Sequence, residues 1–482
     1  MNTFFNRKTI EINGRRLDKY QTRAVLCKKD KYLTVAGAGS GKTLTIVAKI
    51  KYLIESGFKE KDILCISFTN ETVNSLKKSL DSNGYNIDVK TFHKLSLDII
   101  KNKHTIAPND LLEYTTNEYF NAFVYFDNSY KLLDYIDNND DLKNTITTFI
   151  NQMKGQNYDI SFILSLLNNI FISKDDKIVL AFILKVYILY EEELKSENKI
   201  DFNDMINLAI KEISNINYFQ YKYIIIDEYQ DTSQSKYNLI NKLINKFNCK
   251  LMAVGDDYQS IYSFTGCNLS LFTKFKKYFK NSKIIKLKNV YRNPSDITII
   301  SKRFVMKNRH QINKKLKSNK YVSNSITIVY SNDDKVSFSK IIESIDNILI
   351  LGRNNKDIEV LKEDSLLTEV DNKLVYKYDK NKNIRFLTVH KSKGLEEENI
   401  IILNVVDSVL GFPNKIKSNN VLNYLRNYNY FEEERRLFYV ALTRAKEKVF
   451  IFTKRNQESI FIKELLKDFK KKIKVVDLTK NL

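Results

Sequence analysis

The sequence contains no tryptophan, only 3 prolines and only 4 cysteines among its 482 residues. The cysteines are Cys27, Cys65, Cys249 and Cys267, and none belongs to a C-x-x-C pair, so no zinc or iron–sulfur motif is readable. Reduced thiols are typical of a cytoplasmic protein. The N-terminus has no apolar leader, and no uncharged apolar run is long enough to span a membrane. We therefore expect a cytoplasmic protein that does not contact membranes.

The chain carries a large excess of positive charge. The formal net charge is +22, from 79 Lys and Arg against 57 Asp and Glu. A basic surface attracts nucleic acids and speeds their encounter. However, abundant Lys, Asn and Ile beside scarce Pro also indicate an AT-rich genome, which supplies lysine codons without a functional need. The charge therefore supports nucleic-acid binding without establishing it.

Short apolar runs of β type alternate with longer helical stretches, and no Gly/Ser-rich or Pro-rich linker interrupts them. Near-continuous apolar runs are typical of buried parallel strands, and their alternation with helices predicts doubly wound α/β domains. The span 94–199 differs, because it is rich in Asn and Asp and mostly helical, which predicts a helical insertion in the first sheet. The apolar runs begin at Tyr32, Ile63, Tyr223, Leu251 and Ile284, and in a second set at Ile326, Ile348, Ile384, Ile400 and Lys448.

A glycine-rich segment, AGAGSGKT at 36–43, follows the first apolar run and precedes a helical pattern. This is the strand–loop–helix context of a phosphate-binding P-loop. Its glycines let backbone N–H groups converge on phosphate oxygens, and the helix N-terminus adds positive partial charge. We expect Lys42 to bridge the β- and γ-phosphates of ATP and the Thr43 hydroxyl to ligate Mg²⁺. The expected nucleotide contacts are Ala38, Gly39, Ser40, Gly41, Lys42 and Thr43.

Two carboxylates follow a second apolar run. Asp227 and Glu228 come directly after YIII, and the carboxyl ends of parallel strands lie beside the phosphate loop in a doubly wound sheet. We expect Asp227 to hold Mg²⁺ and Glu228 to orient and deprotonate the attacking water. An Asp-Glu pair alone is usually surface charge, so this interpretation depends on the P-loop and the preceding strand.

The segments DEYQDTS (227–233) and VGDDYQSIYSFTG (254–266) resemble the UvrD/Rep/PcrA branch of superfamily 1 DNA helicases. The resemblance implies two RecA-like P-loop domains with parallel sheets, a helical 1B insertion, and a 2B domain that is absent or vestigial. The motifs span nearly the whole chain. In order, the other matching segments are LDKYQTRAV (17–25), SFTNETVNSL (67–76), VKTFHKLS (89–96), DFNDM (201–205), NVYRNP (289–294), FLTVHKSKGLE (386–396) and EEERRLFYVALTRAK (432–446).

The resemblance also implies roles around the nucleotide. Gln259 would sense the γ-phosphate and link it to DNA, and Arg292 and Arg444 would be arginine fingers. Both arginines can complete the site only when two domains close on ATP, which would link closure to the phosphate state. Around the base and sugar the family implies contacts from Gln21 to the adenine edge, from Tyr291 to the ring face and from Glu396 to the ribose.

A second set of residues is implied along single-stranded DNA. Aromatic side chains would stack on bases, at roughly 1–3 kcal/mol per base, beside a basic and polar track. Without the motifs, Phe68 and Tyr262 would be read as core aromatics and a lone histidine as structural. The implied DNA contacts are Phe68, Asn70, Thr91, His93, Tyr262, Phe264, Thr388, His390 and Lys393.

The sequence departs from the family pattern at a few places. Thr265 stands where relatives usually have an arginine, and Leu44 replaces the Arg that often follows the P-loop Thr. The span from Arg353 to Thr388 is too short for a 2B domain and predicts a hairpin or a short helix. The expected domains are 1A, the ATP-binding RecA-like domain, at 1–100 and 201–293, 1B at 101–200 and the RecA-like 2A at 294–482.

Three functions follow from these observations. The first is an ATP-dependent DNA helicase or translocase that moves 3′→5′ on single-stranded or tailed duplex DNA, an isomerase-type enzyme with a nuclease or repair protein as partner. The alternative is a DNA-stimulated ATPase subunit of a nuclease-containing, Gabija-like anti-phage complex that unwinds little; the short span before Thr388 motivates it. The third is a P-loop ATPase with no nucleic-acid role, or a binding module whose hydrolysis is dead. The dead module is disfavoured because all the catalytic residue types are present.

Overall fold

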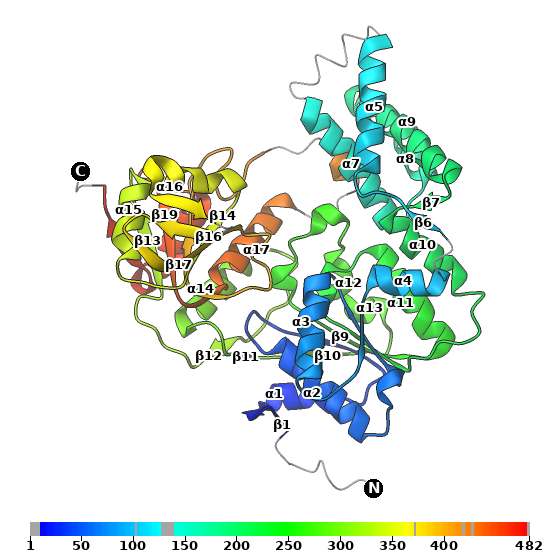
Figure 1. The fold of residues 1–482 in the computed structure, drawn as a ribbon, viewed down its shortest axis with the longest axis horizontal. Helices are drawn as coiled ribbons and strands as arrows, with labels where there is room; N and C mark the ends of the chain where they lie inside the picture. Colours follow the sequence, from blue (N-terminus) through cyan, green and yellow to red (C-terminus); the bar gives the residue numbers. More distant parts are fainter. Residues whose placement is uncertain are drawn as a thin grey trace.

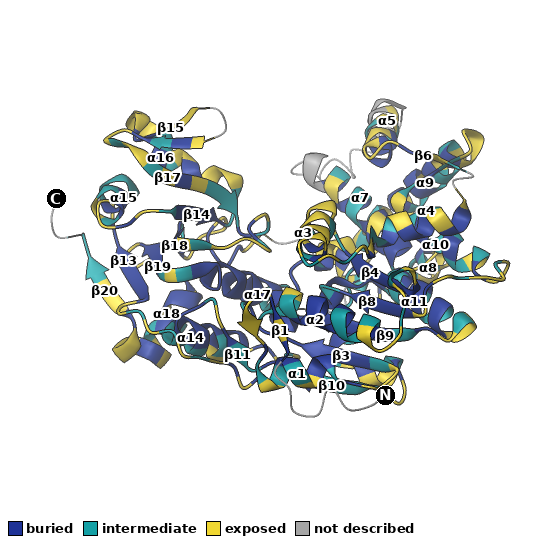
Figure 2. Cartoon of the chain, turned by 60° about the horizontal axis from the view of Figure 1, so that its bottom comes forward, coloured by how far each residue is buried: buried dark blue, intermediate teal, exposed yellow. Residues whose placement is uncertain are grey.

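The computed structural model describes residues 10–101, 104–126, 139–370, 373–416, 420–425 and 429–479. The chain forms two α/β lobes and a helical insertion that projects from the first lobe (Figure 1). In both lobes the central strands are buried between helices, whose outer faces are exposed (Figure 2). Within the described ranges, no helix combines the length and apolar composition that a membrane span requires.

The first lobe is built on a parallel sheet of 6 strands in the order β10-β3-β9-β8-β4-β5. Successive residues of β8 point to opposite faces, so Ile224 and Ile226 join one apolar core while Tyr223 and Ile225 join another. The strands are β3 (Lys31–Val35), β4 (Ile63–Ser67), β5 (Asp88–Thr91), β8 (Tyr223–Ile226), β9 (Lys250–Gly255) and β10 (Lys283–Lys286).

Helices cover both faces of this sheet, as a doubly wound fold requires. On one face lie α1 (Lys19–Val25), α2 (Lys42–Glu55) and α3 (Asn70–Asp81). On the other lie α4 (Phe92–Ile100), α10 (Phe202–Glu212), α11 (Gln234–Phe247), α12 (Leu269–Thr273) and α13 (Phe275–Tyr278). Short 3₁₀ turns follow two of the strands: η2 (Tyr229–Asp231), η3 (Asp257–Gln259) and η4 (Ser263–Thr265).

The insertion leaves and rejoins the first lobe at one place, where β6 (Thr105–Ile106) pairs with β7 (Lys199–Ile200). Its helices bury their own apolar core, which includes Phe149, Ile183 and Val186. The helices are α5 (Leu111–Phe126), α7 (Asn139–Gly155), α8 (Ile160–Leu167) and α9 (Lys174–Ser196).

The second lobe contains a sheet of 8 strands in the order β15-β16-β17-β14-β18-β19-β13-β20. The strands from β17 to β20 are parallel, and β15 and β16 add an antiparallel edge. The strands are β13 (Ile326–Tyr330), β14 (Ile348–Gly352), β15 (Leu367–Val370), β16 (Lys373–Tyr376), β17 (Asp379–Thr388), β18 (Glu397–Ile402), β19 (Ala445–Thr453) and β20 (Lys474–Asp477). The helices are α14 (Ser295–Val305), α17 (Tyr430–Leu442) and α18 (Ile460–Phe469) on one face, and α15 (Asp334–Ile342) and α16 (Glu359–Lys362) on the other.

A short turn from the second lobe is anchored in the insertion. This turn, η7 (Asn420–Tyr424), lies beside α7, and Val421, Leu422 and Leu425 are buried in the insertion core (Figure 1, orange beside α7). The Tyr424 hydroxyl donates to Asp176 Oδ2 at 2.8 Å, and Gln156 Nε2 donates to the Leu425 carbonyl at 3.0 Å. The insertion therefore contacts both lobes.

The predicted fold class of two α/β units with parallel sheets is confirmed, and every apolar run named as a strand lies in one of the two sheets. The edge strands β5 and β20 were not predicted from the sequence. Their exposed or half-buried residues, such as Asp88 and Lys474, break the apolar pattern that identifies a buried strand. Between Arg353 and Thr388 the described residues form 3₁₀ turns, α16, β15, β16 and β17.

Candidate nucleotide and DNA site

The phosphate loop lies between β3 and α2, at the carboxyl edge of the first sheet. Helix α2 begins at Lys42, and Gly41 before it has a left-handed backbone with φ of 78°. A side chain on Gly39 would meet Arg292, since a Cβ built there lies 2.4 Å from Arg292 Cβ. The Tyr291 backbone N–H donates to the Gly39 carbonyl at 2.8 Å. Glycine thus allows the segment of Arg292 to pack directly on the loop.

Lys42 and Glu228 form an ion pair of 2.6 Å across the loop. Asp227, directly after β8, accepts a hydrogen bond from the Glu228 N–H at 2.9 Å. Glu228 itself has a left-handed backbone with φ of 52°, an unfavourable conformation for a non-glycine residue that is often found at functional sites. Burial raises the pKa of Asp227, and repulsion from Glu228 adds to it. Burial alone would raise the pKa of Glu228, but attraction to Lys42 and Lys393 outweighs it and lowers that pKa.

The side-chain oxygen atoms of Thr43 and Asp227 suit a Mg²⁺ ion that binds together with a nucleotide. Thr43 is exposed in the first turn of α2, and Asp227 is partly buried at the end of β8. Hydroxyl and carboxylate oxygens are ligands that Mg²⁺ accepts, and this ion usually takes few protein ligands beside substrate phosphates. In the described part of the chain, no group of 3 or more His, Cys, Asp and Glu side chains is placed to hold a metal alone.

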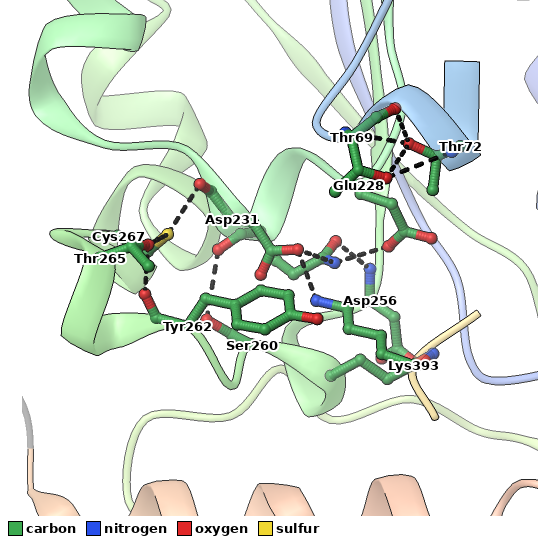
Figure 3. A network of polar contacts seen from close by, with 12 residues as sticks. Thr69, Thr72, Glu228, Asp231, Asp256, Ser260, Tyr262, Thr265, Cys267 and Lys393 are labelled. Carbon is green, nitrogen blue, oxygen red and sulfur yellow. Dashed lines mark hydrogen bonds and ion pairs between the residues drawn. The ribbon is translucent and has the colours of Figure 1, made fainter. Parts of the chain in front are cut away.

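A buried hydrogen-bond chain extends from Glu228 towards the second lobe. Gln230 Nε2 donates to Glu228 Oε2 at 2.6 Å, and Gln230 Oε1 accepts from the Asp256 N–H at 2.9 Å. Gln259 Nε2 donates to Asp256 Oδ2 at 2.7 Å, and Gln259 Oε1 accepts from Arg444 Nη2 at 3.0 Å. The carboxylate after β8 and the arginine after α17 therefore share one network, part of which Figure 3 shows.

Both predicted arginine fingers lie at this cleft. Arg292 pairs with Glu396 at 2.5 Å, and its Nη1 donates to the Thr443 carbonyl at 3.4 Å. Arg444 is fully buried and also donates to the Leu395 carbonyl at 2.9 Å. Burial lowers the pKa of Arg444 to about 9, and repulsion from Arg292 adds to this shift. Two neighbouring guanidinium groups that repel each other make a favourable place for a phosphate charge.

At the predicted base end, Tyr291 is 56% exposed, so its ring face is open to stacking. Its hydroxyl donates to Asp18 Oδ2 at 2.7 Å. Gln21 is buried, and both polar atoms of its amide are bonded inside the protein: Oε1 accepts from the Asp18 N–H and Nε2 donates to the Ser40 carbonyl. Gln21 could contact adenine only if these two hydrogen bonds were broken. Glu396, the predicted ribose contact, pairs with Arg292 and, at 3.3 Å, with Lys446.

A cluster of rings joins the two lobes on the predicted DNA path. Phe264 lies 6.0 Å from Tyr262 and 5.9 Å from His390 between ring centroids. Lys393 Nζ lies 4.4 Å from the centre of the Tyr262 ring and pairs with Asp231 at 2.5 Å (Figure 3). Phe264 is 47% exposed, which favours a stacking surface over a core role. Thr388 ends β17, which leads into His390.

The other predicted DNA residues lie in the first lobe after β4 and β5. Phe68 packs against Phe92 at 5.2 Å, with Lys236 Nζ 4.7 Å from its ring centre. His93 packs against Phe202 at 5.1 Å. Among the described residues no ring contact connects this group to Tyr262 or Phe264. Asn70 is exposed at the start of α3, and the Thr91 hydroxyl caps α4.

Neither predicted DNA-path histidine should act as a cation at neutral pH. Burial lowers the pKa of both His93 and His390 to about 4, and nearby Lys236, Arg353 and Lys393 add to the effect. If the two histidines had an ordinary pKa of about 6.5, lowering the pH from 8 to 6 would make them positively charged and tighten DNA binding. We expect instead that affinity for an oligo-dT strand, measured by fluorescence anisotropy at constant ionic strength, changes less than about twofold over this range. A gain that the double variant His93→Gln/His390→Gln removes would contradict these pKa shifts.

Sequence analysis missed several residues of the site. Asp18, Asp231 and Asp256 carry hydrogen bonds or ion pairs to predicted site residues. The Tyr439 hydroxyl accepts from the Ala38 N–H of the phosphate loop at 3.3 Å. Each lies inside a motif that was recognised, so its position was visible, but nothing in its spacing identified its partner. The roles assigned to the predicted site residues stay predictions.

Comparison with known proteins agrees with this arrangement. Residues 17–280 match the UvrD/REP helicase N-terminal domain, and residues 358–456 match the UvrD-like helicase C-terminal domain. ATP-dependent DNA helicase Rep of Buchnera aphidicola subsp. Schizaphis graminum is 29% identical over 429 residues, covering 82% of this chain and 61% of that protein. The Rep protein of Buchnera aphidicola subsp. Acyrthosiphon pisum is 32% identical over 345 residues, covering 67% of this chain and 50% of that protein.

DNA helicase IV of Escherichia coli K12 is 28% identical over 512 residues, which cover 95% of this chain and 71% of that protein. The chain spans only about half to three fifths of the length of the two Buchnera relatives. The N-terminal domain match alone nevertheless covers more than half of the sequence, from the segment of Gln21 to the helices after β9. By these matches the chain belongs to the UvrD/Rep family of helicases.

Proposed function

We propose that this chain is an ATP-dependent DNA helicase or translocase that moves 3′→5′ on single-stranded DNA. The proposal includes the domain division into 1A at 1–100 and 201–293, 1B at 101–200 and 2A at 294–482. The substrates are ATP with Mg²⁺, and single-stranded or tailed duplex DNA. All three relatives compared above are named as DNA helicases, which supports this activity. No observation in the described residues favours a chain that only serves a nuclease.

One observation carries the proposal: groups from both lobes meet at the phosphate loop. Arg292 of the first lobe packs on Gly39, and Tyr439 on α17 of the second lobe accepts a hydrogen bond from the Ala38 N–H of the loop. Beyond α17, Arg444 bonds Gln259 of the first lobe. A γ-phosphate held there would bind both lobes at once, so its cleavage would weaken the contact between them. That is the property that a motor needs to convert hydrolysis into relative movement.

Hydrolysis requires the Lys42–Glu228 pair to separate. Phosphates entering the loop give Lys42 a competing anionic partner, which releases Glu228 to accept a proton from water. Gln230 holds the second carboxylate oxygen of Glu228 and limits its rotation. Mg²⁺, held by Asp227 and Thr43, would neutralise charge on the β- and γ-phosphates. Arg292 and Arg444 would stabilise the charge that develops in the transition state.

The nucleotide site and the predicted DNA site are linked by a short stretch of chain. Only Ser260 and Ile261 separate Gln259 from Tyr262 in the chain. Two side chains of α17 hold this path: Arg436 Nε donates to the Ser260 carbonyl at 2.6 Å, and Glu433 accepts from the Ser263 N–H at 3.1 Å. Movement of α17 relative to the first lobe would therefore displace the rings that face DNA.

The test is ATP turnover of the purified chain with and without single-stranded DNA, paired with unwinding of duplexes that carry a 3′ or a 5′ tail. We expect turnover to rise at least about tenfold with DNA and unwinding to start only from the 3′ tail. Unwinding only from a 5′ tail would refute the direction. Turnover that is indifferent to DNA would refute the proposal itself.

Phe264→Ala is expected to slow translocation more than basal ATP turnover. The ring is exposed and contacts His390 of the second lobe. A phenyl ring has no polar atom with which to bond to the nucleotide network. Loss of one stacking platform, roughly 1–3 kcal/mol, should weaken single-strand affinity about 5- to 150-fold. Stopped-flow translocation on labelled oligo-dT and DNA-free ATP turnover provide the comparison. Equal loss of both would mean that Phe264 serves packing, and Phe272→Leu, inside the first-lobe core, is the matched control for packing loss.

A further inference from the structure

A connecting segment, residues 306–318, leads from α14 of the second lobe back to the first lobe. It ends at β12 (Lys317–Ser318), which pairs with β11 (Asn289–Val290). Leu316 packs on the phosphate loop, with Cδ1 2.7 Å from the place where a Cβ of Gly37 would lie. The Ile312 N–H donates to Asp257 Oδ2 at 2.7 Å. The connecting segment therefore contacts both the phosphate loop and the turn that follows β9.

Lys314 is the charged centre of this segment. Its side chain is 0% exposed and pairs with Asp257 at 2.7 Å and with Asp256, and both carboxylates are also 0% exposed. Its ammonium lies 3.7 Å from the centre of the Tyr258 ring. Burying a lysine and two adjacent carboxylates is unfavourable unless they pair closely. A buried ion cluster of this kind serves better to fix an orientation than to add stability, and Lys314 has no role among those assigned above.

The ion cluster fixes Asp256, and Asp256 in turn binds Gln259. Lys314 binds Oδ1 of Asp256, and Oδ2 of the same carboxylate accepts the Gln259 amide at 2.7 Å. Because Nε2 of Gln259 is bonded to Asp256, Oε1 of the same amide faces Arg444 and accepts from its Nη2 at 3.0 Å. The backbone N–H of Asp256 also donates to Gln230, the partner of Glu228. Both branches of the site network therefore meet at Asp256.

We propose that Lys314 is a positioning residue for the γ-phosphate sensor: by pairing with Asp256 it fixes the carboxylate that orients Gln259 between the nucleotide and Arg444. This inference rests on the proposed function. Without Lys314, two neighbouring buried carboxylates repel each other, and Asp256 turns or takes a proton. Gln259 then loses its fixed acceptor and rotates freely. Because the connecting segment continues from α14, Lys314 also makes this orientation depend on the position of the second lobe.

The test is Lys314→Met, which keeps the length of the stem and removes the charge. We expect kcat for DNA-stimulated ATP turnover to fall roughly 10- to 100-fold, since displacement of a positioned group by about 1 Å has such effects. KM for ATP should rise together with the loss of ATPγS affinity, whereas the contacts that ADP shares, from the loop, Lys42 and Tyr291, are unchanged. Affinity for ATPγS should fall towards that for ADP, whereas affinity for ADP, measured by calorimetry, should hold. A merely structural role would not separate ATPγS from ADP.

Lys307→Met is the matched control. Lys307 lies in the same segment, but it pairs with Glu464 at 2.9 Å and Asp468 at 2.6 Å, on α18 of the second lobe. We expect its turnover and its preference for ATPγS to match the wild type. A Lys314→Met protein that folds, by circular dichroism, and turns over ATP within about twofold of wild type would overturn the inference.

Asp256→Asn tests the same link from the other side if Lys314→Met does not fold. It leaves Lys314 paired with Asp257, so no buried charge loses its partner. It removes the charged acceptor of Gln259, and we expect the same fall in kcat with ADP affinity held. Wild-type turnover in this variant would overturn the inference as well. If the wild-type chain itself neither binds nor hydrolyses ATP, the proposed function fails instead, so the two failures are distinguishable.

Discussion

Lys42→Ala is expected to reduce ATP turnover at least about 1000-fold, below detection in a coupled assay. The ammonium lies at the start of α2, where the backbone N–H groups of the loop converge, and its only charged partner among the described contacts is Glu228. We expect it to stabilise the charge that develops on the γ-phosphate as the bond to the leaving group lengthens. Its removal also leaves Glu228 without a counterion, so the carboxylate and Asp227 repel each other more strongly. Neither the arginines nor Mg²⁺ would replace a cation at that position.

DNA binding should survive the same substitution, because Tyr262, Phe264 and His390 make no contact with Lys42. Affinity for oligo-dT without nucleotide, measured by anisotropy, is expected to stay within about threefold of wild type. Lys51→Ala, further along α2 and away from the loop, is the matched control and should keep full turnover. Turnover within tenfold of wild type would show that Lys42 is not the phosphate lysine. Loss of the circular dichroism signal would show a folding defect instead.

The parts of the fold that sequence predicted are those determined by local patterns. Buried parallel strands such as β8 must be apolar on both faces, so their runs stand out in the sequence. The phosphate loop combines a strand, glycines and a helix start within 13 residues of chain, from β3 to Thr43. Motif resemblance then supplied what pattern alone could not, namely that Arg292 and Arg444 belong to the same cleft as the loop.

Contacts between distant segments were beyond sequence reasoning. Lys314 is one of 79 basic residues in a chain whose lysines are mostly solvated, and nothing in its neighbourhood distinguishes it from Lys315 or Lys317. Its burial depends on how the connecting segment folds back onto η3. The same holds for the anchor of Leu422 in the insertion, since an apolar residue between β18 and α17 reads as second-lobe core. In both cases tertiary packing, not the local pattern, decides the partner.

Geometry also refines what the resemblance implied. The family role for Gln21 requires a free amide, yet both of its polar atoms bind Asp18 and Ser40 inside the protein. The Asp18 carboxylate accepts the hydroxyl of Tyr291 and the Asp18 N–H donates to Gln21, so the ring predicted to stack on the base and the amide are linked through one residue. The adenine end of the site thus behaves as one hydrogen-bonded unit. A change in one of these side chains is expected to affect the others.

Arg444→Lys is expected to lower kcat roughly 100- to 1000-fold while KM for ATP changes little. The guanidinium donates at once to Gln259, to the Leu395 carbonyl and to the Val440 carbonyl, and it adjoins Arg292. A lysine keeps the charge, but its single ammonium cannot span three acceptors in this fork geometry. An arginine finger typically contributes about 10³–10⁵ to the rate, so an imperfectly placed charge should lose most of that factor.

Arg435→Lys controls for the cost of changing a buried arginine on α17. Arg435 pairs with Glu464 at 2.5 Å within the second lobe and makes no described contact with the nucleotide network, so turnover should stay near wild type. Single-turnover hydrolysis with saturating ATP isolates the chemical step from product release. If Arg444→Lys kept wild-type single-turnover rates, Arg444 would serve only to pack α17 against η3. Closure of the second lobe on ATP would then depend on other contacts, such as the hydrogen bond between Tyr439 and the Ala38 N–H of the loop.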